Sequence, residues 1–293
     1  MTSIGRRTLL TSAAAISAVR PLQAAPSAPL DPDVQADVIL ALRKLRYRAD
    51  NGIVFWWIVG SKYIQVGSSL TLLYNMHVGT AMRVKNSDGG TFGVTSLETV
   101  FYTDPAGGAE LKEWKNPYTG ATVAVPIDMV GPITLFYRPD GTPIMPTEIG
   151  GAPLQAEAHI GPAVVAGDDV WVRDDSTARV TGKDPAAAPF VVNDWATYAG
   201  KVSDVRNAKL MSAPATVTLQ EVTGFQRWMQ MGDTAEAKTG NLFSRGVGRK
   251  VASYAEMPPI WRGLVAAHFP DIARELASDP NKALDRATAK FER

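Results

Sequence analysis

Two segments of the chain carry ionisable side chains on strand faces that are otherwise apolar. Residues 91–102 alternate in character as a β-strand would. The face that carries Glu98 also carries the less polar residues Val94, Val100 and Tyr102. A buried carboxylate without a partner is costly, so such a group is paired, protonated or exposed in a cavity. We expect Glu98 to act as a general acid or base and Tyr102 to donate a hydrogen bond to a reacting molecule.

The second segment, residues 217–231, has the period of a single long strand. Glu221 and Arg227 share a face with five apolar residues: Val217, Leu219, Phe225, Met229 and Met231. Glu221 is a second candidate for acid–base chemistry, and Arg227 could hold a developing negative charge. Two structural alternatives remain open. A bulge at Gly93 would turn Glu98 toward solvent, and Glu221 with Arg227 could form an ordinary ion pair.

The candidate ligand-binding residues follow directly in the chain. Trp228, Met229 and Met231 could line a pocket for an apolar molecule, or could simply belong to the core. In the glycine-spaced segment "SRGVGRK", Arg245 and Lys250 could receive an anionic group, or could lie in a solvated turn. An apolar interior with a few convergent charges is typical of a small-molecule site.

The elements that must position these residues are mostly strands. A helix is predicted over residues 31–48, where apolar residues recur at helical spacing after Asp31-Pro32. Strands are predicted near residues 53–59, 70–85 and 91–102, and helices return after residues 257–259. Residues 174–207 are rich in Ala, Pro and Asp and are expected to be irregular. The pattern predicts a mainly β (α+β) fold, a large antiparallel sheet or lipocalin-like barrel with an N-terminal helix and short C-terminal helices.

Turn residues separate the strands at three places. Asp104-Pro105-Ala106-Gly107 fits a type I turn, Asn116 to Gly120 is a similar device with one more residue, and Arg138 to Gly141 is the third. We therefore interpret Asp104 and Asn116 as turn formers whose side-chain oxygens accept from local amides. Turn residues between short β-rich segments are typical of β-hairpins, and they favour a meander of antiparallel strands.

The N-terminus reads as a targeting segment. Arg6-Arg7 precedes a short apolar stretch, residues 8–19, and the small residues of a cleavage site follow at Ala24-Ala25. We predict a twin-arginine signal peptide over residues 1–25 and a single globular domain over 26–293. The predicted partner is the twin-arginine export machinery, and the predicted location is the periplasm or the exterior. After cleavage we expect no association with a membrane.

Composition excludes several function classes. The chain has no cysteine, which rules out disulfides, thiolate metal ligands and a cysteine nucleophile. It has only three histidines, so no metal site is predicted. The formal net charge of +1 does not indicate the strongly positive surface that is typical of nucleic-acid-binding proteins. No nucleotide-binding motif is present, and no cofactor is expected.

Several segments resemble a mainly bacterial family catalogued as domain of unknown function 1838. They are "FYTDP" with "LKEWKNPYTGATVAV", then "RWMQMGD", "GNLFSRGVGRKV" and "EMPP". The first turn lacks the Thr-Gly of the family pattern, and Leu97 stands where the pattern has Arg. The resemblance implies an exported soluble domain and brings no established activity or catalytic residues.

These observations favour an exported enzyme that acts without a redox cofactor on a small, mainly apolar or aromatic molecule. Carboxylate acid–base chemistry would make it a lyase, a hydrolase or an isomerase. Two alternatives belong to other classes. A lipocalin-like carrier would need the pocket but no paired ionisable groups inside it, and a structural or partner-binding module would show an exposed apolar patch.

Overall fold

The computed structural model describes residues 29–149, 152–181 and 189–286. The predicted signal peptide therefore lies outside the described residues. None of the helices in these ranges is long and apolar enough to cross a membrane.

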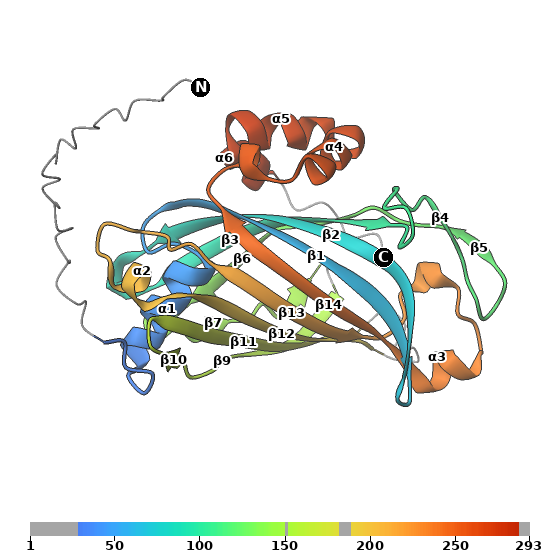
Figure 1. Ribbon diagram of the computed structural model, residues 1–293, viewed down its shortest axis with the longest axis horizontal. Coiled ribbons are helices and arrows are strands. Elements are labelled where there is room, and N and C mark those ends of the chain that lie inside the picture. Colours follow the sequence, from blue (N-terminus) through green and yellow to red (C-terminus); the bar gives the residue numbers. More distant parts are fainter. Residues whose placement is uncertain (1–28, 150–151, 182–188, 287–293) are drawn as a thin grey trace, which may run out of the picture.

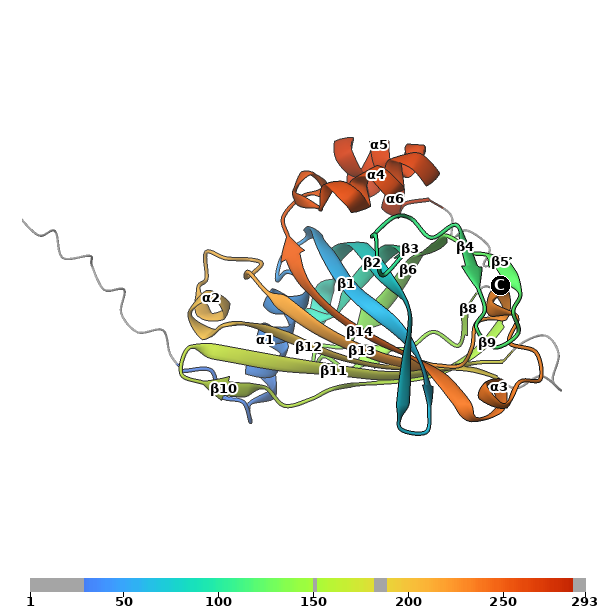
Figure 2. The same cartoon turned by 45° about the vertical axis from the view of Figure 1, so that its right-hand side comes forward.

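One antiparallel sheet dominates the molecule (Figure 1). Its hydrogen-bonded order is β7-β6-β3-β2-β1-β14-β13-β12-β11-β9-β8, and β10 pairs with β11. Figure 2 shows the sheet curling into a barrel that is nearly closed. The strands are β1 (Gly52–Val66), β2 (Ser69–Asn86), β3 (Phe92–Thr103), β6 (Asp128–Tyr137), β7 (Pro143–Ile144), β8 (Glu148–Ile149), β9 (Ala152–Ile160), β10 (Val164–Ala166), β11 (Asp169–Val180), β12 (Phe190–Lys201), β13 (Thr216–Thr223) and β14 (Gly240–Val251). The predicted fold class is confirmed.

Strand alternation sorts the side chains between the barrel interior and its outer surface. On β13 the odd-numbered residues face inward, and Val217 is buried while Thr218 is exposed. On β1, β3, β12 and β14, and on β2 from Tyr74 onward, the even-numbered residues face inward. Ile160 of β9 packs against the buried cluster that contains Tyr137 of β6, so side chains bridge the two ends of the curled sheet.

The helix α1 (Gln35–Arg46) closes one end of the barrel. Its apolar residues Val38, Leu42 and Leu45 are buried against inward-facing residues of β11, β12 and β13. The short helix α2 (Val202–Arg206) packs beside it, and Arg206 forms an ion pair with Asp37. The predicted helix starts one turn later than expected, because Asp31 accepts from the amide of Asp33 in a turn before the helix.

The opposite end is covered by a hairpin and an aromatic cluster. The hairpin consists of β4 (Glu113–Lys115) and β5 (Thr122–Ala124), and it packs near the 3₁₀ helix η2 (Arg227–Met229). Asn116 is fully buried between them. Its Oδ1 accepts from the amides of Tyr118 and Thr119, and its Nδ2 donates to the carbonyl of Met229 at 2.8 Å. Asn116 is thus both a turn former, as predicted, and a link to η2.

The helices α4 (Pro259–His268), α5 (Pro270–Ser278) and α6 (Pro280–Leu284) lie on the outer surface of β1–β3 (Figure 1). Trp261 is buried there and donates from Nε1 to Thr99 Oγ1 at 3.0 Å. It occupies the space above Gly79, where a Cβ would lie only 2.1 Å from the indole ring. Two further short helices are η1 (Asp88–Gly90) and η3 (Tyr254–Glu256), and α3 (Ala235–Thr239) precedes β14.

Two predictions about elements are wrong. The segment 217–231 is not one strand, because β13 ends at Thr223 and η2 follows at Arg227. The described part of residues 174–207 is not irregular, because it contains most of β11 and all of β12, which pair over twelve residues from Asp169↔Lys201 to Val180↔Phe190. Cross-strand pairing overrides the weak local propensity of their Ala and Asp residues.

Candidate active site

A row of polar residues crosses the barrel interior through four neighbouring strands. The register pairs Lys62 of β1 with Ser244 of β14, Ser244 with Glu221 of β13, and Glu221 with Asp194 of β12. Directly paired residues on one face of a sheet are in contact range of each other. We call these four residues the interior row.

Glu221 is at the centre of the interior row. Lys62 Nζ lies 3.1 Å from Glu221 Oε1, and Ser244 Oγ donates to the same oxygen at 3.1 Å. Lys62 is only 5% exposed, so the ion pair compensates a buried ammonium group. The Glu221 side chain is 25% exposed, which means that solvent reaches this part of the interior.

Glu98 approaches the interior row from the other side of the barrel. It lies on β3, and Thr80 of the paired strand β2 donates from Oγ1 to Glu98 Oε2 at 3.2 Å. The irregularity in the pairing of β3 with β6 falls on β6, which inserts Gly131-Pro132, so the alternation of β3 is undisturbed. Gly93 is paired without a bulge. Glu98 therefore stays on the inward face, as its alternation predicts, and it is half-buried.

Asp194 is perturbed by its surroundings. Burial, together with the nearby charges of Glu221 and Glu98, raises the pKa of Asp194 to about 7 against the opposing effects of Lys62 and Arg46. Like charges that share a poorly solvated space cannot all ionise, so one of them keeps a proton. At neutral pH the Asp194 carboxyl is consequently divided between its protonated and ionised forms.

One wall of this interior is polar and is supplied by α1. Arg46 at the end of the helix forms an ion pair with Asp174 of β11. The next residue, Tyr47, shares a 2.7 Å hydrogen bond with Tyr137 of β6, and both hydroxyls are buried. Burial raises the pKa of the Tyr198 hydroxyl on β12, so it remains a neutral hydrogen-bonding group.

The other wall is apolar and aromatic. Tyr102 packs against Tyr74 with ring centroids 4.7 Å apart, and both are buried. Trp228 contacts both rings and Trp114 of the hairpin. Of the predicted ligand-binding residues, Met229 and Met231 are buried in this same cluster, and Trp228 is partly exposed.

Three predicted site residues lie elsewhere. Arg227 is exposed on η2 and does not pair with Glu221, since the strand that would have aligned them ends at Thr223. Arg245 is exposed on the outer face of β14, whereas Lys250 points inward, so the structure does not bring them together.

Lys250 stabilises the end of α1. Its Nζ donates to the carbonyl oxygens of Lys44 and Tyr47, the latter at 3.1 Å. Burial lowers the pKa of Lys250 to about 7, with a smaller effect from the positive charge of Arg48. Cations at the last carbonyls of a helix are favourable, so this contact is a helix cap.

Sequence reasoning missed Lys62, Asp194, Ser244 and Thr80. The signal for Lys62 was present, because it alternates with the apolar residues Trp56, Ile58 and Ile64 on β1. Asp194 also alternates with Ala196 and Tyr198, but it lies in a segment that composition assigned to a loop.

Residues 50–133 match the family model described as "Protein of unknown function (DUF1838)". The resemblance to this family is confirmed over those residues. The matched segment contains Lys62 of the interior row, together with Thr80 and Glu98. The other three residues of the interior row, Asp194, Glu221 and Ser244, lie outside it. No curated protein matches the chain. Among solved structures, a DUF1329 family protein from Desulfovibrio piger is 9% identical, with a TM-score of 0.20, over 78% of this chain and 95% of that chain.

Proposed function

We propose that the protein is an enzyme that performs acid–base chemistry on a small organic molecule in the barrel interior. The observation that carries the proposal is the convergence of three carboxylates and one lysine from four strands, with the pKa of Asp194 raised to about 7. Proton transfer is most efficient when the catalytic group titrates near the working pH. A carboxyl group whose pKa is strongly raised by burial and by neighbouring charges, as that of Asp194 is, is typical of catalytic sites.

The contacts suggest a division of roles. Lys62 and Ser244 both contact Oε1 of Glu221, and so they hold its carboxyl group in a fixed position. Asp194, which is partly protonated at neutral pH, would give or accept the proton. Glu98, oriented by Thr80, would serve as the second acid–base group on the opposite side of the bound substrate. Lys62 takes the place that Arg227 had in the sequence-based hypothesis, because its cation can stabilise developing negative charge.

The walls indicate the kind of substrate. The aromatic and thioether side chains beside the carboxylates suit an apolar or aromatic body, and the charged groups suit one reacting polar centre. This combination favours a lyase, hydrolase or isomerase reaction, each of which needs only proton transfer and charge stabilisation.

The proposal includes export. Arg6-Arg7 and the short apolar stretch that follows support a twin-arginine signal over residues 1–25. We take residues 26–293 as a single mature domain that works in the periplasm or outside the cell, with the export machinery as a partner.

The proposal is tested by incubating the purified protein with a mixture of small organic metabolites and following each compound by mass spectrometry. The wild-type protein and an Asp169→Asn control, altered at an exposed carboxylate on β11, should deplete the same compound. Glu98→Gln and Asp194→Asn should each slow this depletion by about 10²–10⁴-fold, the usual contribution of a positioned acid–base group.

Two outcomes would reject the enzyme hypothesis. If a compound binds all four proteins and is recovered unchanged, the protein is a carrier. If depletion is equally fast in all four, the interior carboxylates do not take part in the chemistry. Thermal melting of each variant shows whether the folded protein is being compared.

A further inference from the structure

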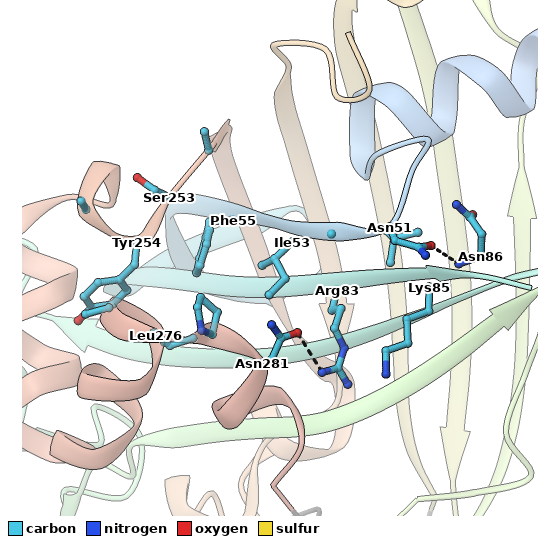
Figure 3. A pocket seen from close by; sticks show the side chains of 16 residues that line it. Asn51, Ile53, Phe55, Arg83, Lys85, Asn86, Ser253, Tyr254, Leu276 and Asn281 are labelled. Atoms are coloured by element: carbon cyan, nitrogen blue, oxygen red, sulfur yellow. Dashed lines mark hydrogen bonds between the residues drawn. The ribbon is translucent and has the colours of Figure 1, made fainter. Parts of the chain in front are cut away.

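A groove on the outside of the barrel is separate from the interior row. It has a volume of about 780 Å³ and lies where the start of β1 and the end of β2 meet η3, α5 and α6 (Figure 3). Sixteen residues line it, among them Asn51, Ile53, Phe55, Arg83, Lys85 and Asn281. We call it the helix-side groove. Arg83 and Lys85 are odd-numbered residues of β2, so they face away from the barrel interior.

The charge of the lining has one sign. Its two ionisable charged residues are Arg83 and Lys85, and none of the sixteen is acidic. Both lie on the same face of β2, and Figure 3 shows their side chains projecting to the same side of the strand. Neighbouring polar groups of Asn51, Asn86 and Asn281 also line the groove.

The positive charge of Arg83 is incompletely compensated. Arg83 is 8% exposed, and its Nε has no hydrogen-bond partner among the described residues. Its terminal nitrogens reach Asn281 Oδ1 at 3.3 Å and Asp285 Oδ1 at 2.7 Å. The Asp285 side chain is 61% exposed, so most of this counter-charge is solvated. A buried guanidinium with one solvated partner attracts a further anion.

The side chain of Lys85 makes no hydrogen bond or ion pair with any described residue, although its charge acts on Asp285, and it is exposed beside Arg83. A structural role for Arg83, holding α6 against the sheet, explains the contacts with Asn281 and Asp285. It does not explain why a second cation lies at the same place with no side-chain hydrogen bond or ion pair to the part of the chain that the structure describes.

The other part of the groove is apolar. Phe55 and Leu276 are buried in the core between the sheet and the C-terminal helices, with Ile53 partly buried against it. We propose that the helix-side groove binds a small amphipathic organic acid, with its carboxylate at Arg83 and Lys85 and its hydrocarbon part on Ile53, Phe55 and Leu276. A guanidinium and an ammonium together match a carboxylate, and the apolar surface supplies affinity for the hydrocarbon part.

The test uses octanoate as the probe, with 1-octanol and octylammonium as probes of the same chain length but different charge. Binding to the full protein is followed by amide chemical-shift changes and by calorimetry. Octanoate should shift amides around the helix-side groove, and 1-octanol should bind about tenfold more weakly because it lacks the charge-assisted contacts. Octylammonium should be weaker still.

Two variants separate binding from a structural role. Lys85→Ala removes an unbonded charge and should weaken octanoate binding by about threefold to fivefold, with melting unchanged. Asp285→Asn removes the competing carboxylate and should tighten binding by a similar factor. Lys115→Ala, which removes an exposed lysine from the β4–β5 hairpin, serves as the matched control and should change nothing.

The proposal is overturned if 1-octanol binds as tightly as octanoate, or if the shifted amides belong to the barrel interior. It is also overturned if Lys85→Ala and Asp285→Asn both bind octanoate like the wild type. In that case Arg83 only anchors α6, and Asp285→Asn should lower the melting temperature without any gain in affinity.

Discussion

Asp194 is the residue on which the chemistry of the interior row depends. Its carboxyl is buried enough to lose much of its hydration, and two further carboxylates lie within electrostatic range. Lys62 cannot neutralise all three, because its ammonium is engaged with Glu221 at 3.1 Å. The proton retained by Asp194 near pH 7 is therefore a consequence first of its burial and then of the two further acids that the strands bring into the same interior.

The raised pKa of Asp194 makes part of the stability depend on pH in a known direction. Its folded-state pKa lies above the ordinary value of 3.8, so its contribution is fully present below about pH 4 and is lost as the pH rises through about 7. Asp194→Asn, which stays neutral, should gain stability relative to wild type on going from about pH 5 to about pH 8. Urea unfolding at both pH values measures the difference, with Asp169→Asn as the exposed control. A constant difference between variant and wild type would show that Asp194 titrates like a solvated carboxyl.

At the scale of elements, the register of neighbouring strands assembles the site. Lys62, Ser244, Glu221 and Asp194 are dispersed over more than 180 positions of the sequence, and only the pairings β1–β14–β13–β12 bring them into one row. Alternation predicted correctly that Glu98 and Glu221 face inward, because period two is a local property of a strand. The order of the strands is a long-range property, so the partners Lys62 and Asp194 could not be inferred in the same way.

The alternation of apolar and polar residues also gave a wrong prediction at the end of β13, where the strand stops before the alternation does. Phe225, Arg227 and Met229 continue the period of β13 by coincidence, while Gly224 follows its last residue and η2 begins at Arg227. Asn116, recognised as a turn former, has a second contact with Met229 that lies 113 residues away and leaves no mark in the local pattern.

The β4–β5 hairpin gives a test of the turn interpretation. Gly120 has a φ of +74°, and no atom lies near the position of a Cβ, so backbone strain alone opposes a side chain there. Gly120→Ala should lower the free energy of unfolding by about 1–3 kcal/mol. Gly107→Ala, in the preceding turn and without a positive φ, should change it by less than about 0.5 kcal/mol. Equal effects in chemical denaturation would contradict the strain argument.

At the scale of the whole molecule, the barrel is a nearly closed sheet with a different cover at each end. The helix α1 and its Arg46–Asp174 pair occupy one end, and the aromatic cluster occupies the other. The charged interior lies between these two covers, and the C-terminal helices leave it untouched because they pack on the outer surface. The fold class could be predicted from the sequence, since strand period and turn residues recur along the chain. The sequence left open whether the strands form a large open sheet or a barrel.

Export concerns the whole chain. Twin-arginine transport requires both arginines, so Arg6→Lys combined with Arg7→Lys should leave an uncleaved precursor inside the cell. Fractionation with an antibody against the protein, and sequencing of the mature N-terminus near Ala25, provide the measurement. Cleavage and export of the double variant at the normal level would exclude the twin-arginine assignment.

The central claim, that the interior carboxylates form one proton-exchanging site, is tested most directly by titrating the side-chain carboxyl of Asp194 by carbon-13 NMR. We predict a midpoint near pH 7 in the wild type. In Glu221→Gln the midpoint should move down, because a like charge is removed and Lys62 is released toward Asp194. A wild-type midpoint near the ordinary value of 3.8, unchanged in Glu221→Gln, would show three independent solvated acids and would contradict the proposed acid–base site.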